Sequence, residues 1–199
     1  MTKKFLHVGC GHQSKSQLKG FNAPDWQEIR FDIDPSVHPD IVGSLTDMSQ
    51  VDTASVDAVF SSHNIEHLHA HEVPGAIREF HRVLKDDGFV VITCPDLQSV
   101  CKAVAEDKLL EPLYVSPAGP ISPLDILYGH RGFIAQGNVY MAHKCGFTYS
   151  VLLNCFAQGG FVNAYGGARP AAFDLWMIAY KAEAPVERME AMAQAFFPG

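Results

Sequence analysis

Short apolar runs that stop at glycine, proline or polar residues recur along the chain and predict β-strands. The first, FLHVG at 5–9, is nearly all apolar and predicts a buried strand. Further runs of this kind occupy residues 28–34, 39–45, 56–62 and 89–94. Two more runs, at 161–166 and 173–182, predict a closing pair of strands.

Apolar residues at helical spacing lie between several of these runs and predict helices at 70–85, 97–107 and 147–160. Residues 12–26 are polar and are broken by Gly20 and Pro24, which predicts a loop or at most one helical turn. Strands that alternate with helices and are nearly all apolar predict an α/β fold. Its sheet should be mostly parallel and covered on both faces.

The chain of 199 residues is long enough for one domain with a sizeable core, and we interpret 1–199 as a single domain. Residues 108–147 are rich in proline and glycine and too long for an ordinary connection. They therefore predict an insertion or a cap over the active site.

Charge and cysteine usage narrow the possible partners. A formal net charge of −7 disfavours a broad phosphate-binding surface, and no apolar run approaches the length of a membrane span. The N-terminus lacks the apolar region and cleavage site of a signal peptide. Five scattered cysteines without a C-x-x-C pair are typical of reduced thiols, so we expect a cytoplasmic protein.

A glycine turn directly follows the first strand. Gly9 and Gly11 in VGCGH would let the backbone approach a ligand closely, at the edge where α/β sheets bind ligands. The dinucleotide fingerprint needs a third glycine where this chain has Ser14, and the following stretch is a poor helix. A ligand without a pyrophosphate therefore fits better than NAD or FAD. Asp32 and Asp34 end the second strand, where a carboxylate can bind ribose hydroxyls.

Four ordered motifs carry a resemblance to a known family. FLHVGCG, FDIDP, VDAVFSSHNIEHL and IREFHRVLKDDGFVVITCPD together resemble class I S-adenosylmethionine-dependent methyltransferases, and most closely the type-11 methyltransferase domains. The resemblance covers about residues 4–107. It implies a Rossmann-like methyltransferase fold, with a mostly parallel seven-stranded sheet, an antiparallel last strand and helices on both faces. It also implies methyl transfer from S-adenosylmethionine, here to a small-molecule acceptor.

The resemblance further implies a cofactor site, position by position. The glycine loop would wrap the methionine part of the cofactor, and the acidic end of the second strand would hold the ribose: Gly9, Cys10, Gly11, Asp32 and Ile33. The end of the third strand would contact adenine, through Asp47 or through backbone groups around Leu45, because the family's usual aspartate is Ser44 here. The segment after the fourth strand would lie beside the sulfonium, with Ser61, Ser62 and His63.

The segment HNIEHLHAH (63–71) raises the possibility of a metal site. His63, Glu66 and His67 have the H-x-x-E-H spacing of a zinc-binding helix. In the alignment implied by the resemblance, however, His63 leaves a strand, so the required helical face is missing or frayed. An alternative set of ligands is His67, His69 and His71, but their i, i+2 spacing suits neither one face of a helix nor a tetrahedral site from one segment. We therefore expect no native metal ion.

Catalysis of methyl transfer rests mainly on positioning, and a general base is needed only where the acceptor atom carries a proton. His63, His130 and His143 are the candidate bases. Tyr128, with Asp125 and Arg131 in the same stretch, could hold a polar acceptor. Tyr128, His130 and His143 belong to 108–147, and we expect them to line the acceptor pocket.

Other classes of function stay open. A nicotinamide-dependent oxidoreductase would have the same type of α/β fold. Ser14 and the poor first helix argue against this class of enzyme. A metal-dependent hydrolase would rest on HNIEH alone. An S-adenosylmethionine-binding protein without transferase activity is a further alternative. The fourth strand is not followed by [DN]-P-P-[YFW], which argues against a nucleic-acid amino-methyltransferase. We expect no nucleic-acid or membrane partner, and the oligomeric state is open.

Overall fold

The computed structural model describes residues 2–198 and is built around a seven-stranded sheet. The strand order is β3-β2-β1-β4-β5-β9-β8, and β9 runs antiparallel to both of its neighbours. The strands are β1 (Lys3–Val8), β2 (Trp26–Asp32), β3 (Ile41–Val42), β4 (Val56–Ser62), β5 (Leu84–Pro95), β8 (Asn163–Arg169) and β9 (Asp174–Tyr180). The predicted fold class, a mostly parallel sheet with an antiparallel last strand, is confirmed.

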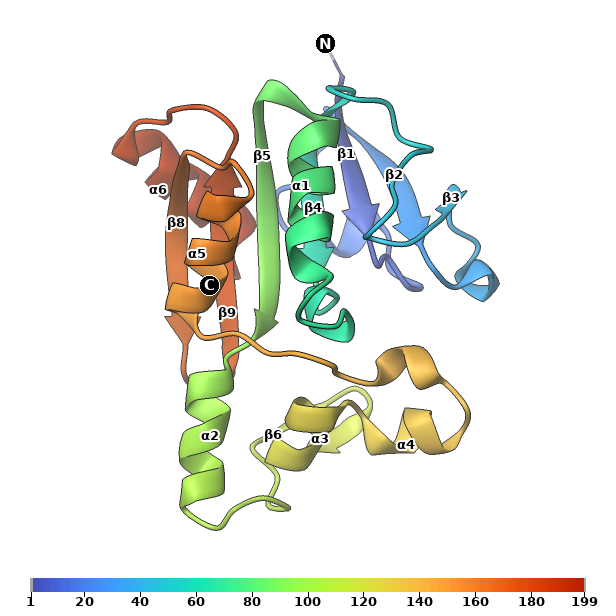
Figure 1. Cartoon of the computed structure of the whole chain (residues 1–199), viewed down its shortest axis with the longest axis vertical. Coiled ribbons are helices and arrows are strands. Elements are labelled where there is room, and N and C mark those ends of the chain that lie inside the picture. Colours follow the sequence, from blue (N-terminus) through green and yellow to red (C-terminus); the bar gives the residue numbers. More distant parts are fainter. Residues whose placement is uncertain (1, 199) are drawn as a thin grey trace.

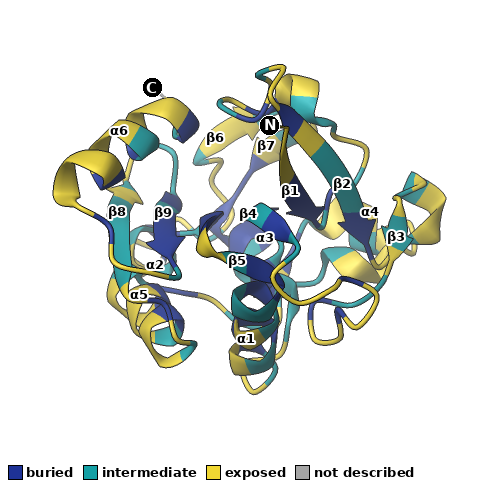
Figure 2. Ribbon diagram, turned by 90° about the horizontal axis from the view of Figure 1, so that it is seen from above, coloured by how far each residue is buried: buried dark blue, intermediate teal, exposed yellow. Residues whose placement is uncertain are grey.

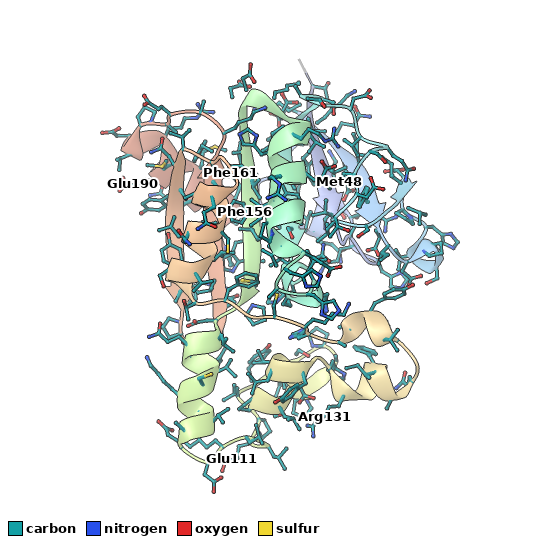
Figure 3. All side chains as sticks on the ribbon, in the orientation of Figure 1. Met48, Glu111, Arg131, Phe156, Phe161 and Glu190 are labelled. Atoms are coloured by element: carbon teal, nitrogen blue, oxygen red, sulfur yellow. The ribbon has the colours of Figure 1, made fainter. Side chains whose placement is uncertain are left out.

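Alternating strand residues fill two cores, one on each face of the sheet. Leu6 and Val8 of β1 pack on one side with α1 (Val73–Val83) and α5 (Tyr149–Gln158), while Phe5 packs on the other. On the first side, Phe156 of α5 packs with Phe161 just beyond the helix (Figure 3). The second side is covered by α6 (Val186–Phe196), which lies opposite α1 and α5 (Figure 2). Helices therefore cover both faces, as the apolar strands predict.

Residues 108–147 form a cap beyond the carboxyl ends of the parallel strands (Figure 1). The cap follows α2 (Leu97–Ala105) and contains only short elements: β6 (Tyr114–Ser116), β7 (Gly119–Ile121), α3 (Pro123–Tyr128), α4 (Arg131–Ala135) and a 3-10 turn at Val139–Met141. Its returning chain is held beside the segment that follows β5, because the Leu97 amide at the start of α2 donates to the Phe147 carbonyl at 2.9 Å. This placement puts the cap over the edge where α/β sheets bind ligands.

Most differences from the predicted elements concern boundaries. The polar stretch 12–26 contains a single 3-10 turn, Lys15–Gln17, as expected. The third strand is only two residues long, against the seven predicted. The helix α6 was not predicted.

No helix in residues 2–198 combines the length and apolar character that a bilayer span requires.

Candidate active site

The glycine turn after β1 is tied to the end of β2. Gly9 and Gly11 have φ angles of +61° and +51°, in the left-handed region that favours glycine. The Gly11 amide donates to Asp32 Oδ2 at 2.8 Å, and the Asp34 amide donates to Asp32 Oδ1 at 2.9 Å. Each carboxylate oxygen of Asp32 thus accepts one backbone N–H and keeps lone-pair capacity for a further donor.

Arg30 fixes the outer side of the same turn. Its guanidinium donates to the Gly11 carbonyl at 2.5 Å and to the His38 carbonyl at 2.8 Å. These bonds link the glycine turn to the loop after β2, so the turn has a defined shape before any ligand binds. Sequence reasoning did not identify Arg30, because a charged residue within a strand gives no sign of which carbonyls it will reach.

A cavity of about 560 Å³ opens between this turn, the ends of β2 and β3, and the cap. Of the predicted cofactor residues, it is lined by Gly9, Gly11, Asp32, Ile33, Ser44, Leu45 and His63. Ile33 is 48% exposed, so its apolar side chain is available to a planar ring. The hydroxyl and aromatic groups of a nucleoside match these polar and apolar walls.

Four predicted cofactor residues do not line this cavity: Cys10, Asp47, Ser61 and Ser62. Cys10 is buried, and burial raises the pKa of its thiol to about 11. The Asp47 carboxylate accepts from the Ser49 amide at 3.1 Å. Ser61 is fully buried in β4. Of the two options for adenine, the structure places Ser44 and Leu45 at the cavity and leaves Asp47 outside it.

Asn64 is a cavity residue that the sequence did not single out. It lines the cavity, and its amide nitrogen is buried without a hydrogen-bond partner. A buried donor without a partner is costly, and a ligand oxygen would satisfy it. The cap also contributes lining residues that carry no sequence signal of their own: Phe133, Asn138, Tyr140, Met141 and Lys144.

A second cavity of about 210 Å³ adjoins the first beneath the cap. Among the predicted acceptor residues, it is lined by His63, Asp125, His130 and His143, together with Glu66 and His67. Both cavities share His63, His67, Phe133 and Met141, so they meet at these side chains. Tyr128 is 63% exposed and lines neither cavity, so the structure does not bring it to the site.

His63 stands where the two cavities meet and has an unusual backbone. Its φ angle is +46°, which is uncommon outside glycine and is a form of local strain often found at functional sites. The His63 amide donates to the Thr93 carbonyl at 2.9 Å, which helps to hold this conformation at the end of β4. Burial lowers the pKa of His63, but the Glu66 carboxylate outweighs it, and the net direction is upward.

His130 and His143 each have one ring nitrogen engaged. His130 Nδ1 accepts from the Phe133 amide at 3.3 Å, so His130 caps the start of α4. His143 Nδ1 lies 2.6 Å from the Ile126 carbonyl, which can only accept, so this nitrogen carries the proton. Burial lowers the pKa of His143, against the opposing charge of Glu66, and the ring is therefore neutral at pH 7.

Asp125 and Arg131 bind each other within the cap. Arg131 Nε donates to Asp125 Oδ1 at 2.7 Å, and Ser122 Oγ donates to Asp125 Oδ2 at 2.6 Å (Arg131 is labelled in Figure 3). Burial works to raise the pKa of Asp125, but these bonds outweigh it and hold that pKa well below its usual range. The pair therefore stabilises the cap, and its charges are already neutralised before any acceptor arrives.

Gly9→Ala tests the fit of the glycine turn. A Cβ at Gly9 would lie 2.3 Å from the Asn64 side chain, at a φ angle that disfavours L-residues. We expect a loss of about 1–2 kcal/mol in the free energy of unfolding, from denaturant titration. Gly75→Ala in α1 is the control: a Cβ there meets nothing within 4 Å, and we expect no loss. Equal stability of Gly9→Ala and the parent would contradict this geometry.

The fold and the glycine–aspartate cavity define a class I methyltransferase architecture. Residues 6–92 match the family model described as "Methyltransferase domain". The match confirms the predicted resemblance and the predicted cofactor, S-adenosylmethionine. Comparison with curated proteins gave no match.

Similar solved structures share the fold at low sequence identity. One is a methyltransferase from Methanosarcina mazei, with 14% identity, a TM-score of 0.57, and coverage of 92% of this chain and 94% of that chain. Another is the Burkholderia thailandensis 1,6-didemethyltoxoflavin-N1-methyltransferase, with 15% identity, a TM-score of 0.56, and coverage of 92% and 72%. A third is the citrinin polyketide synthase CMeT domain, with 12% identity and a TM-score of 0.57. There the match covers 92% of this chain but only 47% of that chain, less than half its length.

Proposed function

We propose that this protein is an enzyme that transfers the methyl group of S-adenosylmethionine to a small-molecule acceptor held under the cap. The observation that carries the proposal is the meeting of two cavities at His63 and His67. The larger has the glycine turn and Asp32, and the smaller is lined largely by cap residues. A donor and an acceptor bound side by side would therefore face each other at the carboxyl edge of the sheet.

S-adenosylmethionine supplies a methyl group already activated on a sulfonium, so the chain has chiefly to bind and orient. Asp32 would accept from the ribose hydroxyls, and the free amide of Asn64 would donate to the methionine part. The cap would exclude water and fix the acceptor, and such positioning can account for about 7–11 kcal/mol of a reaction barrier. His63 and His143 are placed to take a proton from an acceptor that must lose one.

The size of the smaller cavity supports a small acceptor. At about 210 Å³ it is below the usual range for drug-sized ligands, roughly 300–1,000 Å³. The structure of the methyltransferase from Burkholderia thailandensis contains bound 1,6-didemethyltoxoflavin and S-adenosylhomocysteine, so a protein of similar fold binds a small molecule together with the cofactor product. The absence of a nucleic-acid partner and the cytoplasmic location stay predictions.

Two rival functions give different binding results. A nicotinamide-dependent oxidoreductase would bind NAD, whereas a methyltransferase or an S-adenosylmethionine-binding protein would bind S-adenosylhomocysteine. In titration calorimetry we expect S-adenosylhomocysteine to bind at one per chain and NAD to give no binding heat. Binding of NAD in place of S-adenosylhomocysteine would contradict the proposed function.

A further inference from the structure

Glu66 is buried in a way that needs explanation. Its side chain is 1% exposed, and neither carboxylate oxygen has a hydrogen-bond partner. A buried carboxylate is costly unless a positive charge or several donors satisfy it. The nearest basic group, His63 Nδ1, lies 3.5 Å from Glu66 Oε1, which is too far for a strong hydrogen bond. The other carboxylate oxygen has no partner.

Two further imidazoles face the same carboxylate. One potential ligand atom from each of Glu66, His67 and His143 lies within 4.8 Å of the others. His143 comes from the cap, 76 residues after His67. The returning chain of the cap brings it there, because the amides of Lys144 and Cys145 donate to the Glu66 carbonyl at 2.8 and 3.2 Å.

The ring nitrogens of both histidines are already oriented for ligation. His67 Nδ1 lies 3.0 Å from the Ala142 carbonyl, and His143 Nδ1 lies 2.6 Å from the Ile126 carbonyl. A carbonyl oxygen only accepts, so each Nδ1 carries the proton and each Nε2 keeps its lone pair. Histidines that bind metal ions usually donate their other ring N–H to a carbonyl or carboxylate in this manner.

We propose that Glu66, His67 and His143 form a binding site for one divalent transition-metal ion. Two imidazoles and one carboxylate suit zinc, iron or cobalt, whereas magnesium prefers oxygen ligands. Ligands about 2.1 Å from such an ion lie roughly 3.4 Å apart in a tetrahedron, so atoms that lie within 4.8 Å of one another need to close by at most about 1.4 Å. The expectation of no metal considered the segment 63–71 alone, and His143 supplies the ligand that this segment lacks.

The three ligands line the smaller cavity, so an open coordination position would face the acceptor. This step rests on the proposed function. The open position then favours an acceptor with an oxygen that coordinates the ion, such as a hydroxyl. Methyl transfer would form the carbon–oxygen bond and break the carbon–sulfur bond. The hydroxyl proton passes to His63, which lines the same cavity and is not a ligand, because both ring nitrogens of His143 are then engaged. S-adenosylmethionine leaves as S-adenosylhomocysteine.

Cobalt(II) added to the chelator-treated protein tests the site by its optical absorption, without any need for turnover. We expect one Co²⁺ per chain, with intense d–d bands that Zn²⁺ abolishes by displacement. His143→Ala and Glu66→Gln should both lose these bands. The two substitutions remove ligands from different segments, and each variant is used once its thermal melting in chelator shows a folded protein. The matched control is the double variant His69→Ala/His71→Ala, because these exposed rings stack on each other outside the cluster.

Three outcomes would overturn the proposal: no Co²⁺ bands in the parent, bands that persist in His143→Ala, or bands that disappear in the double control. S-adenosylhomocysteine titration of the same protein separates the two proposals. Metal binding without S-adenosylhomocysteine binding contradicts the proposed function only, and the reverse contradicts the metal site only.

Discussion

Asp32→Ala is expected to weaken S-adenosylhomocysteine binding by about 1–3 kcal/mol, or roughly 5- to 150-fold in Kd. The substitution removes the charged acceptor that we propose for the ribose hydroxyls. It also releases the Gly11 and Asp34 amides, which donate to this carboxylate at 2.8 and 2.9 Å. Both effects act on the larger cavity, and titration calorimetry measures their sum.

The control for this change is Asp47→Ala. Asp47 is an exposed aspartate outside the cavity, and its carboxylate accepts only from the nearby Ser49 amide. We expect its removal to leave the affinity within about 0.5 kcal/mol. Unchanged binding in Asp32→Ala would show that the ribose lies elsewhere. A loss confined to Asp47→Ala would restore Asp47 as the adenine contact.

Substitution of the cap histidines should reduce turnover far more than cofactor binding. We expect His143→Ala and His130→Asn each to lower kcat by at least about 100-fold, the size expected for loss of a positioned catalytic or binding group. The affinity for S-adenosylhomocysteine should stay within about 1 kcal/mol, because neither residue lines the larger cavity. Asparagine at 130 keeps an acceptor for the Phe133 amide, so the N-cap of α4 is preserved.

Tyr128→Phe is the matched control for the cap, because Tyr128 lies in the same segment but is exposed. We expect its turnover to equal that of the parent. Parent-like kcat in both histidine variants would show that the smaller cavity does not hold the acceptor. A large loss in Tyr128→Phe would show that the cap closes differently around a bound acceptor.

The sheet and the glycine turn could be predicted because their signals are local. Gly9 and Gly11 end an apolar run, and Asp32 closes the next one, so strand order alone brings them together. The helix α6 also carries a local signal: Met189, Ala193 and Phe196 recur at helical spacing and are buried. The sequence therefore carries enough information to predict this helix, although the helix is not among the elements predicted above.

The cap and its contacts could not be predicted in the same way. Its helices have five and six residues and are held by specific bonds, such as Asp125 with Arg131, rather than by a long apolar face. The burial of Glu66 runs against the usual exposure of carboxylates. Its meeting with His143 depends on where a chain of more than seventy residues returns. Such long-range contacts leave no periodic pattern in the sequence.

Transfer of a labelled methyl group tests the proposed function most directly. The protein is incubated with methyl-labelled S-adenosylmethionine and a cell extract, which is then separated into small-molecule, nucleic-acid and protein fractions. We expect the label in the small-molecule fraction, at a rate that falls in Asp32→Ala. Label found only in nucleic acid or protein, or no label despite intact S-adenosylhomocysteine binding, would contradict methyl transfer to a small molecule.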